Sequence, residues 1–229
     1  MSEHMPPRPV RIWDLPTRLF HWALALCVLG AVISAKLGGN AMVWHMRLGY
    51  AALTLLGFRL LWGLVGGRWS RFSSFFYSPA ALWRYLSRRP RPDDHFEVGH
   101  NPLGAFSVLL MLGWLLLQVG SGLIADDEIA LTGPLVRFVS GEISLAWTAY
   151  HKSYGQWGLY LLVVLHVLAI LYYRLGRRRD LIGPMISGDK HLPAHVPPTR
   201  DTLATRLFAL TLLGACAAAV YLLVNLGAA

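Results

Sequence analysis

Four histidines lie inside, or at the ends of, segments that are apolar enough to cross a membrane: His21, His45, His151 and His166. An imidazole in hydrocarbon is costly, so it usually marks a ligand or a proton path. Neutral imidazole is also a good iron ligand. Two histidines on one segment and one on each of two others are the right number for two haems, each held by a pair. The pattern predicts a membrane electron carrier.

The composition places the chain in a membrane. Of its 229 residues, 55% are hydrophobic and 14% are charged, and the mean hydropathy is +0.46. One soluble core of this size cannot bury so many apolar groups. Five apolar stretches approach or exceed the ~20 residues that a transmembrane helix needs: residues 16–35, 41–65, 102–125, 149–173 and 203–226.

The basic residues predict the topology. Most of the 21 Lys and Arg residues lie at the ends of stretches, or in connections, on the same predicted side of the membrane. The exceptions are Lys36, Arg47, Arg137 and Lys152. By the positive-inside rule, the N-terminus is cytoplasmic and the C-terminus periplasmic, in a bacterial inner membrane. Because the basic residues are distributed by side and not gathered in one patch, the net charge of +9 does not indicate nucleic acid as a partner.

Two connections between the stretches are informative. Residues 78–89 place apolar and aromatic side chains among arginines, which predicts a short amphipathic helix in the lipid headgroup region. Residues 126–148 form a longer external connection, acidic at its start, where we expect an external partner to bind. Cys27 and Cys216 stand alone, without the Cys-x-x-Cys-His motif of covalent haem, so any haem here is non-covalent.

The topology also assigns each histidine a depth. His21 lies near the cytoplasmic end of its stretch, whereas His45 lies near the external end of the next. His151 opens the fourth stretch at the external face, and His166 follows ~22 Å deeper at 1.5 Å per residue. This predicts two pairs, His45 with His151 and His21 with His166. Fifteen residues are also close to four helical turns, so one helix can serve both haems.

Small residues stand one turn beyond three of these histidines: Ala25, Gly49 and Gly155. A flat macrocycle lying along a helix needs that missing side-chain volume. The same residues would also let two helices approach each other closely. Both interpretations remain open for each residue, but their position on the histidine faces favours haem.

Haem propionates are anionic and prefer cationic partners at the membrane boundary. Arg18 shares the helical face of His21 and is the first candidate, with Arg59 the second. Near the external pair, Arg47 and Lys152 could equally extend to the interface. His100 precedes the third stretch, where it could cap the helix, contact a propionate or lie near a quinone.

Four segments carry a resemblance to a known family: residues 10–22 (VRIWDLPTRLFHW), 45–66 (HMRLGYAALTLLGFRLLWGLVG), 99–105 (GHNPLGA) and 151–173 (HKSYGQWGLYLLVVLHVLAILYY). They resemble the prokaryotic cytochrome b561 and nickel-iron hydrogenase b-type cytochrome superfamily. The resemblance implies an all-α integral membrane protein, in which a four-helix bundle holds two non-covalent b haems. It also implies ligands from the first, second and fourth helices, and electron exchange with quinone. We therefore expect a di-haem domain at residues 1–190 and a linker with an additional fifth helix at 191–229.

Three functions are compatible with these features. The first is electron transfer between the quinone pool and a periplasmic partner, such as a c-type cytochrome, a hydrogenase or another oxidoreductase. The second is a superoxide or small-oxidant:quinone oxidoreductase without a protein partner, which would need an external haem edge framed by Arg47 and Lys152. The third is a transporter whose histidines form a proton path. Whether the chain forms a homodimer stays open.

Overall fold

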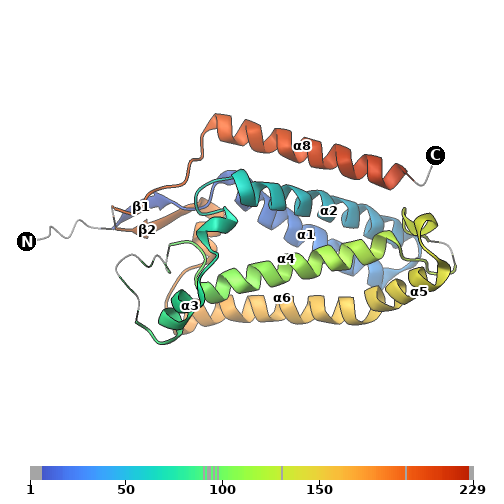
Figure 1. Ribbon diagram of the computed structural model, residues 1–229, viewed down its shortest axis with the longest axis horizontal. Helices are drawn as coiled ribbons and strands as arrows, with labels where there is room; N and C mark the ends of the chain where they lie inside the picture. Colours follow the sequence, from blue (N-terminus) through green and yellow to red (C-terminus); the bar gives the residue numbers. More distant parts are fainter. Residues whose placement is uncertain are drawn as a thin grey trace, which may run out of the picture. The chain divides into compact units, whose positions relative to one another are not determined.

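The computed structural model describes residues 7–89, 91, 94, 96, 98–129, 131–193 and 195–226. Within these residues, five helices are long and apolar enough to cross a membrane (Figure 1). They span Leu15–Leu37, Gly39–Val65, Pro102–Leu123, Gly141–Gly176 and Leu203–Asn225. The prediction of an all-α membrane protein with five spans is therefore confirmed.

The elements follow one another along the chain as Figure 1 shows. Besides the α-helices there are two short strands, three turns of 3₁₀-helix (η1, η2, η3) and two π-helical turns (η4, η5) among the described residues. In chain order they are β1 (Arg8–Arg11), α1 (Leu15–Leu37), η1 (Gly39–Ala41), α2 (Met42–Val65), η2 (Phe72–Ser74), α3 (Pro79–Leu86), α4 (Pro102–Leu123), η3 (Val136–Phe138), α5 (Gly141–Tyr150), η4 (His151–Gly155), α6 (Gln156–Leu171), η5 (Tyr172–Gly176), α7 (Ile182–Ser187), β2 (Asp189–Leu192) and α8 (Leu203–Asn225).

Polar side chains fix where the first helices begin. The Asp14 carboxylate accepts a hydrogen bond from the Thr17 backbone N–H at 2.8 Å, which caps the N-terminus of α1. The Ser78 hydroxyl accepts one from the Ala81 N–H at 3.2 Å and caps α3 in the same way. Helix α3 is the short helix that the sequence predicts within residues 78–89.

The fourth span begins earlier than predicted. The sequence indicates a loop over residues 126–148, but α5 already starts at Gly141. The Ser140 hydroxyl caps α5 by accepting from the Ile143 N–H at 3.4 Å. The buried Ser144 hydroxyl donates to the Ile124 carbonyl at 2.8 Å, so this polar residue is satisfied inside the fold. The prediction failed because it followed apolar runs alone, and α5 carries such polar residues.

The described residues fall into two compact units. One unit draws on Met1–Phe20, Arg59–Leu109 and Val167–Leu210. Its strands β1 and β2 pair antiparallel, with Val10 opposite Lys190 (Figure 1). Around this ribbon lies a core of buried apolar side chains: Val10, Ile12, Trp13, Trp69, Val98, Leu192 and Val196.

The other unit draws on His21–Phe58, Leu110–His166 and Thr211–Ala229. It contains all four of the membrane histidines and is helical apart from its connections. Polar contacts tie its helices together: Lys36 on α1 donates to Gln156 on α6 at 3.0 Å, and Trp114 on α4 donates to the Gly155 carbonyl at 3.0 Å. The domain boundary near residue 190 stays a prediction.

Candidate functional site

The histidine rings face each other in two pairs within one compact unit. His45 on α2 and His151 in η4 have ring centres 5.9 Å apart and ring planes at 88°. His21 on α1 and His166 on α6 have ring centres 6.3 Å apart and planes at 47°. These are the two pairs that the depth of each residue predicts. Their role as ligands stays a prediction.

The spacing within each pair fits one metal ion between two imidazoles. A metal–imidazole nitrogen bond is about 2 Å long, so two such rings on opposite sides of one ion have centres roughly 6 Å apart. Both observed ring distances, 5.9 and 6.3 Å, match this spacing. The two histidines of each pair could therefore both bind the iron of one haem.

The second nitrogen of His45 and that of His151 each have an acceptor. Nδ1 of His45 lies 2.9 Å from the Ala31 carbonyl oxygen. Nδ1 of His151 lies 2.9 Å from the main-chain carbonyl oxygen of Gln118 and 3.0 Å from the Ser121 hydroxyl. A carbonyl oxygen only accepts, so the proton belongs on Nδ1 and Nε2 keeps its lone pair for a metal. This tautomer would leave Nε2 available as a metal ligand.

The other pair is held differently. The Nδ1 atom of His21 is buried and has no hydrogen-bond partner among the described residues. The His21 ring instead makes an edge contact with Trp22, at 5.0 Å between ring centres. An orphaned polar atom in a buried site is costly, so a ligand or a water would have to satisfy it.

A cavity of about 440 Å³ extends along His45 and His151. Gly49 and Gly122 line it, one from α2 and one from α4. A Cβ at Gly49 would meet no atom within 4 Å, whereas a Cβ at Gly122 would lie 3.1 Å from Cε1 of His151. The two glycines keep the wall beside the His45–His151 pair free of side chains, as a flat macrocycle would require.

Of the two roles predicted for Gly155, space for a macrocycle and close helix packing, the structure favours helix packing. A Cβ at this position would collide with the Gln118 side chain on α4. The Gly155 carbonyl accepts the hydrogen bond from Trp114 on that same helix. Gly155 therefore serves close helix packing.

A π-helical turn begins at His151. Such turns are rare, and they occur frequently at functional sites. In a regular α-helix, fifteen residues would leave His151 and His166 about 60° out of register at 3.6 residues per turn. A π turn contains more residues per turn, so it reduces this offset and brings the two histidines closer to one face. No local pattern in the sequence indicates this turn.

The basic residues predicted near propionates lie in the other compact unit. Arg18 donates from Nη1 to the Ile186 carbonyl at 2.5 Å, and its Nε is buried without a partner among the described residues. Arg59 is only 3% exposed and lies 4.8 Å from the Phe72 ring centre. Its Nη1 is also buried without a partner among the described residues. A buried guanidinium with an unused donor suits an anionic group.

His100 lies between two aromatic side chains. Its ring centre is 4.8 Å from that of Trp13 and 4.8 Å from that of Phe75. The Tyr77 hydroxyl donates to the His100 carbonyl oxygen at 2.6 Å. His100 is thus held in an aromatic environment. It lies immediately before α4, the position that the third apolar stretch predicts.

Arg47 and Lys152, the basic residues predicted near the His45–His151 pair, differ in their surroundings. Lys152 lines the cavity beside His45 and His151. The Arg47 guanidinium lies 5.2 Å from the Trp44 ring centre, in a cation–π contact.

Sequence reasoning missed three polar residues that support these sites. The Ser121 hydroxyl on α4 lies beside Nδ1 of His151, and the Gln118 side-chain amide donates to the His151 main-chain carbonyl at 3.1 Å. The signal for both is that polar residues are rare in so apolar a helix. Asp14 is fully buried and accepts hydrogen bonds from Ser70 at 2.8 Å and from Trp62 at 3.2 Å. A lone acid just before the first apolar stretch was its signal.

Apolar helices that carry facing histidine pairs define a class of membrane cytochrome. The family model described as prokaryotic cytochrome b561 matches residues 12–188, and the chain belongs to this family. It is therefore a multi-pass membrane protein of the b-type cytochromes, which bind haem b and transfer electrons.

The curated relatives share a name. The chain is 24% identical over 230 residues to a probable Ni/Fe-hydrogenase B-type cytochrome subunit of Bradyrhizobium diazoefficiens, covering 82% of this chain and 89% of that protein. It is 29% identical to a protein of the same name from Azotobacter chroococcum, covering 78% of this chain and 87% of the relative. The probable Ni/Fe-hydrogenase 1 B-type cytochrome subunit of Escherichia coli is 23% identical, with 77% and 88% covered. No solved structure matches significantly.

Proposed function

We propose that this chain binds two non-covalent b haems, one between His45 and His151 and one between His21 and His166. It would transfer electrons between the quinone pool and a redox partner on the periplasmic side. The observation that carries this proposal is the pair of ring distances, 5.9 and 6.3 Å, on helices of a cytochrome family. Bound haem iron supplies a one-electron redox couple at each pair.

The protein's own residues orient the ligands. The carbonyls of Ala31 and Gln118 hold Nδ1 of His45 and His151, so that both Nε2 lone pairs point away from these hydrogen bonds. The apolar side chains of the surrounding helices limit water, and burial of this kind is one of the factors that set a haem potential. No side chain needs to form a covalent bond.

The two sites would lie at different depths. His151 and His166 belong to one continuous helical segment, and fifteen residues of helix correspond to ~22 Å. The distribution of Lys and Arg supports an inner-membrane orientation with the N-terminus cytoplasmic. The His45–His151 pair would then lie near the periplasmic face and the His21–His166 pair near the cytoplasmic face.

The names of the relatives support a hydrogenase as the partner. Each of the three is described as a cytochrome subunit of a Ni/Fe hydrogenase. We place the quinone on the cytoplasmic side, near His100, whose imidazole could hydrogen bond a quinone oxygen. Arg18 and Arg59 would bind propionates, because each has a buried donor nitrogen without a partner among the described residues.

Quinol-driven haem reduction tests this function. When a soluble quinol is added under anaerobic conditions, the haems of the purified protein should be reduced rapidly. The change in the haem absorption bands reports this reduction. His100→Ala should slow this reduction about tenfold, equivalent to about 1.4 kcal/mol, and leave the spectrum intact. The exposed His191 provides the matched control, and His191→Ala should react as the wild type does.

Either of two outcomes would revise the proposal. Haems that a quinol cannot reduce would exclude quinone as a substrate. An unchanged rate in His100→Ala would remove His100 from the quinone site and leave electron transfer itself in place.

A further inference from the structure

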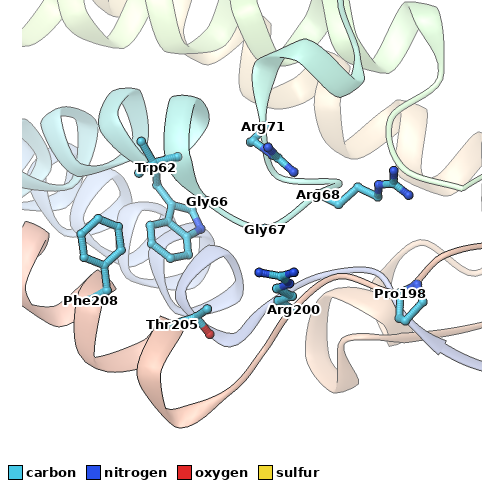
Figure 2. A pocket seen from close by; sticks show the side chains of 10 residues that line it. Trp62, Gly66, Gly67, Arg68, Arg71, Pro198, Arg200, Thr205 and Phe208 are labelled. Atoms are coloured by element: carbon cyan, nitrogen blue, oxygen red, sulfur yellow. The ribbon is translucent and has the colours of Figure 1, made fainter.

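A second cavity, of about 530 Å³, lies in the unit that does not contain the histidine pairs. Among the described residues, three arginines line it and no carboxylate does. Arg68 and Arg71 follow the end of α2, and Arg200 precedes α8, so two distant segments bring the three charges to one opening (Figure 2).

The three guanidinium groups lack a carboxylate partner within the described part of the chain, where no ion pair joins Arg68, Arg71 or Arg200 to an acid. The neighbouring Asp201 accepts instead from Arg11 at 2.7 Å and from Arg206 at 2.8 Å. Three cations around one opening repel each other, and an anion between them would remove that repulsion.

A second acid, next to a residue that lines the cavity, is also engaged. Asp14 lies beneath Gly67, where a Cβ would collide with its Oδ2 atom. Its oxygens accept hydrogen bonds from the Thr17 backbone, Ser70 and Trp62. Asp14 is fully buried and does not line the cavity, so the opening itself remains cationic.

The start of α8 adds to the positive potential. The Thr202 hydroxyl caps this helix by accepting from the Thr205 N–H at 3.3 Å, and Thr205 lines the cavity. Helix α8 contains 23 residues, and the N-terminal end of a helix carries a partial positive charge that favours phosphate groups.

The apolar side of the cavity indicates which anion it takes. Val65, the last residue of α2, is 55% exposed, and Phe208 in the second turn of α8 is 48% exposed. Trp62 lies beside Phe208 with its ring centre 6.3 Å away (Figure 2). Two membrane-spanning helices end here, so the arginines lie at the level of lipid headgroups and the apolar residues at the level of acyl chains.

We propose that Arg68, Arg71 and Arg200 bind the phosphate group of an anionic phospholipid, whose acyl chain lies along Val65 and Phe208. The arginines supply bidentate donors to phosphate oxygens. The site is independent of the histidine pairs and of quinone chemistry. The bound lipid would hold the C-terminal end of α2 next to the start of α8.

Native mass spectrometry of the haem-loaded protein tests the proposal. Phosphatidylglycerol, phosphatidylcholine and inorganic phosphate are titrated separately into the detergent-solubilised protein. We expect phosphatidylglycerol to bind and phosphatidylcholine to bind at least about fivefold more weakly. The combined variant Arg68→Gln, Arg71→Gln, Arg200→Gln should weaken phosphatidylglycerol binding at least about tenfold, since each basic side chain near an anionic surface accounts for roughly fivefold.

A matched control separates the site from general charge. Arg88, Arg89 and Arg178 are exposed arginines outside the cavity, and their triple glutamine variant removes the same charge. It should bind phosphatidylglycerol as the wild type does. Arg71→Gln alone, which changes one exposed side chain, should weaken binding roughly fivefold and keeps the test valid if the triple variant fails to fold.

Three results would overturn the proposal. The first is equal loss of binding in the two triple variants, and the second is unchanged binding in both the cavity triple variant and Arg71→Gln. The third is displacement of phosphatidylglycerol by millimolar inorganic phosphate, which would indicate a site for free anions and not for lipid. Haem absorbance, measured on the same samples, reports separately on the histidine sites.

Discussion

The two histidine pairs differ in how their second nitrogens are held. Carbonyl oxygens fix Nδ1 of both His45 and His151, whereas Nδ1 of His21 has no partner among the described residues. A hydrogen bond to the distal nitrogen makes an imidazole more basic and a stronger ligand. At the residue scale, we therefore expect the His45–His151 pair to retain its haem more firmly than the His21–His166 pair.

The open space beside Gly49 leads to a sharp prediction. Gly49→Leu places a side chain in the cavity along His45 and His151, where a Cβ meets no other atom within 4 Å. The protein should fold, because the added Cβ meets no other atom, but the haem proposed between His45 and His151 should be excluded. Pyridine haemochrome analysis should find about one haem per chain, half of the two proposed from the paired ligands.

Gly214 on α8 provides the control for this substitution. A Cβ at Gly214 would also meet no atom within 4 Å, and this residue does not line the cavity. Gly214→Leu should retain both haems. Full haem content in Gly49→Leu would show that the macrocycle does not occupy this cavity.

At the scale of elements, apolar length was sufficient to predict the spans, because a bilayer requires about 20 apolar residues per helix. It was not sufficient for α5, whose polar residues Ser144 and Thr148 find partners within the fold. The paired strands β1 and β2 were also missed, since they are only four residues long and are separated by most of the chain. The π turn at His151 depends on tertiary packing that no local pattern reveals.

Asp201 connects elements in the unit that does not contain the histidine pairs. It accepts from Arg11 at the end of β1 and from Arg206 in the first turn of α8, and its side chain is 5% exposed. Burial disfavours the charged carboxylate, but hydrogen bonds from Arg206, the Leu15 backbone and Arg11 outweigh burial and lower its pKa. The charged form is therefore bound more favourably in the folded protein than in the unfolded chain.

This lowered pKa predicts a pH-dependent stability. Asp201→Asn should destabilise the protein by about 1.5–3 kcal/mol at pH 7, the range for hydrogen bonds to charged groups. A depressed carboxyl pKa stabilises the fold above the unfolded pKa of about 4, and this contribution is lost as the pH falls through the folded pKa. Thermal unfolding in detergent should show a Tm difference at pH 7 that shrinks as the pH falls below about 4.

The exposed Glu142 serves as the control for Asp201. Glu142→Gln should leave the Tm nearly unchanged across this pH range. A Tm difference for Asp201→Asn that persisted undiminished in acid would mean that charge is not what Asp201 contributes.

At the scale of the whole molecule, much of the site could be predicted from the sequence. Helix direction and residue spacing were enough to propose which histidines face each other, because depth in a membrane is a strong constraint. The position of Arg59 near the end of its helix could be predicted. That its side chain is buried beside Phe72, with 3% exposure, could not. The cationic cavity could not be predicted, since Arg200 meets Arg68 and Arg71 only through the fold.

Haem stoichiometry in histidine variants tests directly whether each of the two histidine pairs binds one haem. A reduced-minus-oxidised optical spectrum with pyridine haemochrome quantification would be recorded for the wild type and for alanine variants of His21, His45, His151 and His166. We expect two b haems per chain in the wild type. His45→Ala and His151→Ala should lose one haem in common, and His21→Ala and His166→Ala the other. A colourless protein from haem-replete cells, or loss of haem in any other pairing, would contradict this expectation.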